Sequence, residues 1–223
     1  MTAPPIVACV QTGSKYGPAD VFRLQSMVAK HLPIPHRFVI LTDAPGEYSG
    51  AETINMPLGL EGWWGKMALF RPFWRDGARV LYFDLDTLVV GDLSPLAALE
   101  TEFGIPANFT RASGEKTPCK YGSCVMTIAP HFGAGVWREF ERWPRKWINE
   151  AGPHGDQWVI QLLAPDATLL QGALPHGFFL GYREMKLHQD KPPPEAALVI
   201  YAGGRTPENF GPDWARDEWR LHC

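Results

Sequence analysis

Two aspartates, one residue apart, follow an apolar run within residues 79–93, RVLYFDLDTLVVGDL. Asp84 and Asp86 come directly after Val80–Phe83, and apolar β-favouring residues resume at Leu88. A continuous apolar run of this length predicts a strand that is buried on both faces of an α/β sheet. Ionised carboxylates inside a core need a neutralising partner, and open α/β sheets bind ligands where their strands end. The pair therefore indicates a divalent cation that holds a phosphate-bearing substrate.

The same two aspartates have a simpler interpretation. An Asp-x-Asp sequence also arises by chance, most often as a solvated turn. Here no Gly or Pro stands before Asp84 to start a turn, so we expect the carboxylates to be embedded in the fold. On this segment alone, a cation site and a solvated turn both stay open.

Length, composition and charge limit the class of protein. The chain has 223 residues, of which 45% are hydrophobic and 20% charged, as in ordinary soluble globular proteins. A formal net charge of −3 with scattered Lys and Arg gives no bulk attraction to nucleic acid or to an anionic membrane. No apolar run approaches the roughly 20 residues that span a bilayer, and no basic region precedes the short apolar run at the N-terminus. We expect no transmembrane segment and a cytoplasmic location.

The four cysteines argue against a zinc site. They are Cys9, Cys119, Cys124 and Cys223. None forms the paired C-x-x-C spacing of structural zinc ligands. Cys9 falls in a predicted strand, where a buried thiol is the expected role. The count fits a reducing compartment.

Periodicity places these residues on alternating strands and helices. Strands are predicted at residues 6–11, 37–41, 52–56, 80–83, 123–128 and 197–201, and helices at 19–32, 63–74, 94–99, 132–143 and 155–163. The first strand, helix and second strand form a βαβ unit, so their ligand-binding edge is expected near residues 12–16. This alternation predicts one α/β domain over residues 1–223, with a nucleotide-binding half at about 1–95 and an acceptor-side half at 96–223.

Several segments, taken in order, resemble a known family. The stretch GKMALFRPFWRDGARVLYFDLDTLVVGDLSPL resembles the core of the glycogenin-like glycosyltransferases, family eight, which have the GT-A fold with a Rossmann-like mixed sheet. There a helix with a Lys precedes a strand that ends in a manganese-binding D-x-D. The segments VACVQTGSKYGPADVFRLQSMV, YGSCVMTIAP, GDQWVI and VIYAGGRTPEN resemble further elements of that family. The likeness spans about residues 5–210, and the order of its elements is more specific than any one motif.

The resemblance implies a role for each matching residue. Around the cation and donor nucleotide, it implies that Mn²⁺ or Mg²⁺ is held by Asp84 and Asp86, that Leu85 between them contacts the donor, and that the base and ribose are lined by Thr12, Gly13 and Tyr16. Around the diphosphate and sugar, it implies roles for Lys66, Gly204 and Arg205, and it places Asp156 and Gln157 beside the donor sugar and the acceptor. Without the resemblance, Lys66 would be interpreted as a surface lysine. Asp156 would be interpreted as an acid in the first turn of a helix, where it interacts favourably with the helix dipole.

Two departures from the family pattern affect the metal and the acceptor. The family's late loop supplies a metal-ligating His, whereas Tyr201-Ala202-Gly203-Gly204 has none, and His188 is the nearest alternative. The family's Asn-Ser-Gly is replaced by Gly122-Ser123-Cys124. The third metal ligand and the contacts to the acceptor are therefore open.

Together these features predict a metal-dependent glycosyltransferase. The donor would be a nucleoside-diphosphate sugar, with UDP as the expected nucleotide, and the acceptor a hydroxyl of a saccharide, a lipid-linked glycan or a protein. The resemblance implies retention of anomeric configuration. One alternative is a sugar-nucleotide-binding module without turnover. Another is a haloacid-dehalogenase-like phosphatase, although the D-x-D-G-T of that class lacks its Gly here, because Thr87-Leu88 follows Asp86.

Overall fold

The computed structural model describes residues 3–45, 48, 51–109, 118–188, 190–201 and 205–222. Its strands are β1 (Ile6–Gln11), β2 (Arg37–Thr42), β3 (Glu52–Asn55), β4 (Val80–Phe83), β5 (Leu88–Val89), β6 (Phe103–Ile105), β7 (Val125–Ile128), β8 (Thr168–Leu169), β9 (Phe179–Gly181) and β10 (Leu198–Ile200). Its α-helices are α1 (Pro18–His31), α2 (Ser94–Ala97), α4 (Ala134–Arg142), α5 (Pro144–Ala151), α6 (Gly155–Leu163), α7 (Leu170–Ala173), α8 (Pro207–Phe210) and α9 (Asp213–Leu221). Short 3-10 helices are η1 (Pro57–Gly59), η2 (Gly62–Phe70), η3 (Gly152–His154) and η4 (Glu184–Leu187).

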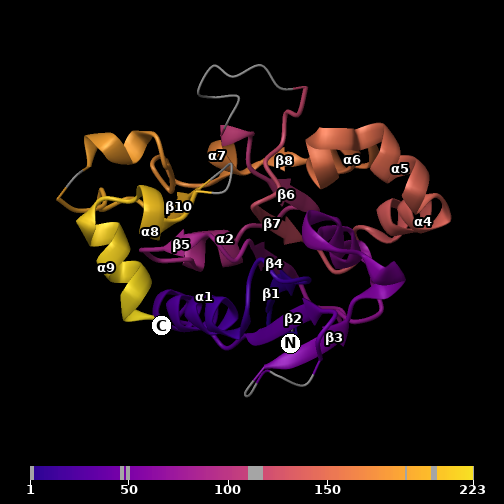
Figure 1. The fold of residues 1–223 in the computed structure, drawn as a ribbon, viewed down its shortest axis with the longest axis horizontal. Coiled ribbons are helices and arrows are strands. Elements are labelled where there is room, and N and C mark those ends of the chain that lie inside the picture. The colour runs from indigo at the N-terminus through magenta and orange to yellow at the C-terminus, as the bar shows by residue number, and fades with distance from the viewer. Residues whose placement is uncertain are drawn as a thin grey trace.

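A seven-stranded mixed sheet forms the centre of the molecule (Figure 1), in the order β3-β2-β1-β4-β7-β6-β8. Strands β3, β2, β1 and β4 are parallel, and β7 runs antiparallel to both β4 and β6. The predicted βαβ unit is confirmed, because β1 and β2 are parallel neighbours joined through α1. A smaller sheet has the order β5-β10-β9.

Elements from distant parts of the chain cover the two faces of the large sheet. Alternate residues of β1 point to opposite faces, as in any strand. On one face Val7 and Cys9 pack with α1, the small sheet and α9. On the other face Ile6 and Ala8 pack with η2, α4, α5 and α6. All four residues of β4 are buried, which confirms the prediction of a strand covered on both sides. Cys9 is also buried, as predicted.

The predicted helix at residues 63–74 is wrong in type and in length. The segment forms the 3-10 helix η2, which ends at Phe70. Arg71 is extended because it precedes Pro72, and a residue before proline is disfavoured in the helical region. At Gly65 an added Cβ would lie 2.7 Å from Cγ1 of Val10. The glycine therefore allows η2 to lie close against β1.

The helix predicted at residues 132–143 is shorter than expected at both ends. Helix α4 ends at Arg142, and Trp143 has φ −140° and ψ 52°. Pro144 follows, so the proline effect operates here as well. Trp143 leaves the buried face and is 51% exposed.

Two smaller observations concern the start of α2 and membrane spans. At the start of α2, the Ser94 N–H donates a hydrogen bond to Asp92 Oδ1 at 2.9 Å. In the described part of the chain, no helix combines the length and apolarity needed to cross a membrane.

Candidate functional site

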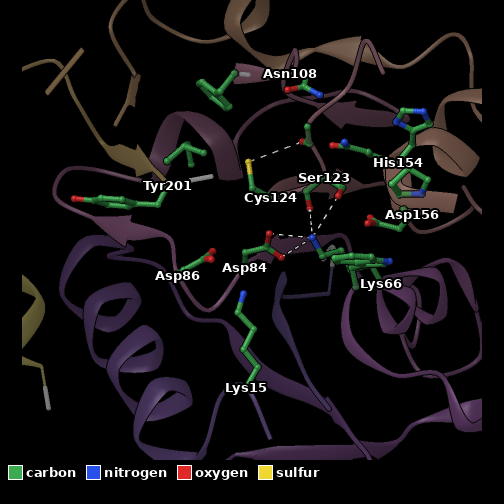
Figure 2. Close-up of a pocket in the computed structure, with 17 residues that line it drawn as sticks. Lys15, Lys66, Asp84, Asp86, Asn108, Ser123, Cys124, His154, Asp156 and Tyr201 are labelled. Atoms are coloured by element: carbon green, nitrogen blue, oxygen red, sulfur yellow. Dashed lines mark hydrogen bonds and ion pairs between the residues drawn. The ribbon is translucent and has the colours of Figure 1, made fainter. Parts of the chain in front are cut away.

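A cavity of about 390 Å³ lies at the carboxyl end of β4. The cavity wall is formed by the β1–α1 loop, η2, the turn after β4, the segment before β7, the start of α6 and the end of β10. The lining residues are Lys15, Trp63, Lys66, Asp84, Asp86, Asn108, Phe109, Gly122, Ser123, Cys124, Pro153, His154, Gly155, Asp156, Gln157, Ile200 and Tyr201. Figure 2 shows these charged side chains converging on one hollow. Of the ligand edge predicted at residues 12–16, Lys15 lines this cavity.

Asp84 is fixed by the end of β4 and by the turn that follows it. Its N–H donates to the Cys124 carbonyl at 2.8 Å, and its own carbonyl accepts from the Thr87 N–H at 3.0 Å. The Tyr82 hydroxyl donates to Asp84 Oδ1. Residues two apart on a strand share a face, so the spacing of Tyr82 and Asp84 was a signal that the sequence analysis missed.

Buried Lys66 forms an ion pair with Asp84, whose side chain is partly exposed. Its Nζ lies 2.8 Å from Oδ1 and 2.9 Å from Oδ2 of Asp84. It also donates to the carbonyl and the hydroxyl of Ser123, at 3.2 and 3.3 Å. Burial lowers the pKa of Lys66, but the charges of Asp84 and Asp156 outweigh it and raise the pKa above its usual value. The ammonium group is therefore a fixed positive charge at the cavity wall (Figure 2).

Asp156 is a buried acid with an unused acceptor. It lies in the first turn of α6, lines the cavity and is 4% exposed. Its Oδ2 has no hydrogen-bond partner among the described residues. Burial raises the pKa of Asp156, against the opposing charge of Lys66. A buried carboxylate oxygen without a donor is costly, and Asp156 belongs to the wall of the cavity.

Asp86 carries the second carboxylate on the cavity wall. Its Oδ2 accepts a 2.7 Å hydrogen bond from the Tyr16 hydroxyl. Burial and the charge of Asp84 raise the pKa of Asp86 to about 6, so its ionised form is poorly compensated. Burial is also the first cause that raises the pKa of Tyr16, followed by the charge of Asp86. Tyr16 remains a protonated hydrogen-bond donor.

The two carboxylates fit a cation that arrives with a phosphate. In the described ranges, no three His, Cys, Asp or Glu side chains gather as a ready metal site. Mg²⁺ and similar ions are commonly held by one or two carboxylates together with substrate phosphates. Asp84 and Asp86 line the same cavity, and the poorly compensated charge of Asp86 is one that a cation would neutralise. The metal-binding atoms would be carboxylate oxygens, which are hard ligands that suit Mn²⁺ or Mg²⁺.

Some predicted donor-binding residues lie away from the described cavity lining. The Gly13 N–H donates to Asp43 Oδ2 at 3.0 Å, at the ends of β1 and β2. Beside it, Thr12 Oγ1 is buried with no partner in the described residues. Leu85 is 2% exposed and packs into the core, so its side chain does not face the cavity.

Of the site residues predicted from the late part of the chain, some line the cavity and others do not. Gln157 lines the cavity together with Asp156. The Arg205 guanidinium stacks on Tyr182 at 4.5 Å and on Phe210 at 5.1 Å from the ring centres. Gly204 lies outside the described residues. His188 lines a different pocket, near Glu184 and Glu195.

Two further side chains of the cavity, Lys15 and His154, were not predicted from the sequence. Lys15 lies in the β1–α1 loop, with its ammonium 4.5 Å from the centre of the Tyr16 ring, and Figure 2 shows it pointing toward the two aspartates. His154 precedes α6 on the opposite wall. Nothing in the sequence distinguishes Lys15 from an ordinary loop lysine, and only the conformation of the β1–α1 loop brings it to the cavity.

Comparison with known proteins identifies the fold. No protein-family model matches the sequence, and no curated protein sequence matches it. Solved structures do match. The galactosyltransferase LgtC, in complex with donor and acceptor sugar analogues, has a TM-score of 0.65 at 14% identity, over 97% of this chain and 95% of that one. The glycosyltransferase GlyE of Streptococcus pneumoniae TIGR4 has a TM-score of 0.70 at 14% identity, over 98% of this chain and 60% of that one.

A third solved structure also matches the fold at low sequence identity. The bifunctional glycosyltransferase WbbM, in its apo form, has a TM-score of 0.62 at 12% identity, over 99% of this chain and 49% of that one. At such low identity these likenesses establish architecture and leave activity open. The fold expected from the resemblance is confirmed: the chain has the GT-A fold of nucleotide-sugar transferases.

Proposed function

We propose that this protein is a glycosyltransferase, which moves a sugar from a nucleoside-diphosphate sugar to an acceptor hydroxyl. The observation that carries the proposal is the cavity at the end of β4, where buried Lys66 lies against Asp84 and Asp156 presents an unpartnered oxygen. A phosphate-bearing sugar needs both kinds of group, a cation for its phosphates and acceptors for its hydroxyls. LgtC, whose fold is similar, binds donor and acceptor sugar analogues.

The charges of the cavity suit a diphosphate leaving group. When the glycosidic bond to phosphate breaks, negative charge develops on the β-phosphate, and fixed positive groups stabilise it. Lys66 supplies such a charge from the wall, and Lys15 is placed to approach the same anion from the β1–α1 loop. A divalent cation held by Asp84 and Asp86 would act there as a Lewis acid. Tyr16 holds the Asp86 carboxylate in place.

Asp156 and Gln157 are assigned to the sugar. The free oxygen of Asp156 accepts a hydrogen bond from a sugar hydroxyl, and Gln157 offers an amide beside it. We further propose UDP as the nucleotide and retention of configuration as the outcome, both on the resemblance to the glycogenin-like enzymes.

The phosphatase alternative fits this geometry less well. It requires Asp84 as a free nucleophile, whereas both carboxylate oxygens lie within 2.9 Å of Lys66 Nζ and Tyr82 also donates to one of them. The same ion pair favours a second alternative, a binding module without turnover. Because Lys66 neutralises Asp84, that carboxylate has less charge left to hold a catalytic cation. Turnover measurements separate these functions.

Binding of the donor should appear as thermal stabilisation. With UDP, GDP and CDP and their sugars, we expect one nucleotide series to raise the melting temperature, and more strongly with Mn²⁺ than with EDTA. A ligand at 100 times its Kd adds about 2.7 kcal/mol of stability, or roughly 5–11 °C for a chain of this size. Hydrolysis of the stabilising sugar nucleotide then distinguishes an enzyme from a binding module. No shift with any nucleotide, with or without metal, would overturn the proposal.

Replacing Asp156 with Asn should separate activity from stability. The amide keeps the shape but removes the carboxylate acceptor, so we expect transfer or donor hydrolysis to fall about 100-fold in kcat/KM. The free energy of unfolding should be unchanged or higher, because burial disfavours the ionised carboxylate. Steady-state kinetics and urea unfolding measure the two effects. The exposed Glu150→Gln serves as control, and a parallel loss of stability and activity would assign Asp156 a structural role only.

A further inference from the structure

Helices α4 and α5 meet at a rigid corner. Trp143 ends the first helix and precedes the second, and its N–H donates to the Phe140 carbonyl at 3.1 Å while its carbonyl accepts from the Trp147 N–H at 3.1 Å. The Trp147 indole N–H also donates to the Glu139 carbonyl at 3.2 Å, which ties α5 to α4. The backbone therefore presents the side chains of this corner in a fixed arrangement.

Those side chains combine an exposed indole with three exposed cations. Trp143 is 51% exposed, and the Arg142 guanidinium lies 5.5 Å from its ring centre. Arg145 and Lys146 follow directly, and no acid occurs between Arg142 and Asn149. We call Arg142, Trp143, Arg145 and Lys146 the basic corner.

The cations of the basic corner have no acidic partner in the part of the chain that the structure describes. Over those ranges, none of Arg142, Arg145 and Lys146 forms an ion pair with a carboxylate. Several exposed cations elsewhere are paired, as in Lys30–Glu218, Arg37–Glu52 and Arg220–Glu208. The positive charge of the corner is therefore available to an external anion, although the chain as a whole carries −3.

A second exposed aromatic side chain lies near α4. Phe73 is 62% exposed, and the Arg71 guanidinium lies 4.2 Å from its ring centre and 5.1 Å from that of Trp137 on α4. Arg71 thus joins the segment after η2 to α4. In Figure 1 α4 and α5 lie at the opposite end of the molecule from α9.

We propose that the basic corner docks on an anionic lipid bilayer. Exposed Trp and Phe beside Arg and Lys are the side chains that bind at the headgroup level, where the rings enter the interface and the cations meet lipid phosphates. Each cation near such a surface contributes about fivefold in affinity. A nucleic acid fits less well, because its binding rests on many phosphate contacts along a basic stripe, whereas this surface is compact and includes an exposed indole.

Docking at this corner would bring the cavity close to the bilayer. Helix α5 ends at Ala151, and the next residues, Gly152–His154, include Pro153 and His154 of the cavity wall. The cavity rim is thus one short helix away from the docked surface. The inference rests on the basic corner alone and stands whether or not the cavity transfers sugars.

Vesicle binding tests the proposal with the full chain. We expect co-sedimentation with vesicles of phosphatidylcholine and phosphatidylglycerol at low salt, and none with phosphatidylcholine alone. Arg142→Ala/Arg145→Ala/Lys146→Ala should weaken binding at least tenfold. Trp143→Ala should weaken it about three- to tenfold while the dependence on salt is kept. The melting temperature of each variant shows that it is folded.

Matched variants control for net charge and exposed apolar area. Lys30→Ala/Lys191→Ala/Arg220→Ala removes the same charge outside the corner, and Leu221→Ala removes an exposed apolar side chain on α9; both should bind as the wild type does. Equal binding to neutral vesicles, or wild-type binding by the triple variant at the corner, would refute lipid docking. Tighter binding to heparin or single-stranded DNA than to the anionic vesicles would also refute it, in favour of a soluble polyanion.

Discussion

Replacing Lys66 with Met is expected to lower the free energy of unfolding by about 1–3 kcal/mol, the usual cost of leaving a polar group of the interior without its partner, because Asp84 remains partly exposed to solvent. The variant leaves Asp84 without its cation, and Asp156 loses the charge that opposes its burial. For a chain of this size the melting temperature should fall by roughly 2–12 °C. Transfer or donor hydrolysis should fall at least 100-fold, because the positive charge at the leaving group is lost. Calorimetry and steady-state kinetics measure the two effects.

A second substitution tests the cause of this loss. In Lys66→Met/Asp84→Asn no uncompensated charge remains at position 84, so the double variant should be more stable than Lys66→Met alone. Lys191→Met, at an exposed site, should stay within about 0.5 kcal/mol of the wild type. If Lys66→Met unfolds at the wild-type temperature, the ion pair does not hold the cavity wall together.

Replacing Asp86 with Asn should abolish metal-dependent chemistry and spare the fold. The amide oxygen still accepts the Tyr16 hydrogen bond, but the anionic ligand for a cation is gone. We expect Mn²⁺-dependent hydrolysis of, or transfer from, the sugar nucleotide to fall at least 100-fold. Stability should stay the same or rise, since burial and the charge of Asp84 disfavour the ionised Asp86 carboxylate.

Metal-dependent binding gives a readout that does not need turnover. The wild type should be stabilised more by UDP with Mn²⁺ than by UDP with EDTA, and Asp86→Asn should lose that difference while keeping any metal-independent part. Asp217→Asn, exposed on α9, should behave as the wild type in both assays. Full Mn²⁺-dependent activity in Asp86→Asn would rule out the carboxylate as a cation ligand.

Local patterns predicted the parts of the fold that depend on local physics. The apolar run at Val80–Phe83 is a strand buried on both faces, and α6 has the bounds Gly155–Leu163 that its periodicity indicates. The alternation of strands and helices gave the parallel βαβ start of the sheet. These features rest on burial periodicity and chain connectivity, which neighbouring residues encode. The predicted helix around Lys66 was wrong because close packing on β1 and Pro72 set its geometry.

The sequence by itself determined that two acids stand at the end of a buried strand, and that a glycine-led helix places Asp156 in its first turn. Only the tertiary structure decided the partners of these acids: Lys66 for Asp84 and Tyr16 for Asp86, from positions 18 and 70 residues away along the chain. Charge pairing depends on distance in space, and a contact between residues so far apart follows from how the layers pack. For the same reason Lys15 joins the cavity, whereas Arg205 stacks on Tyr182 and Phe210.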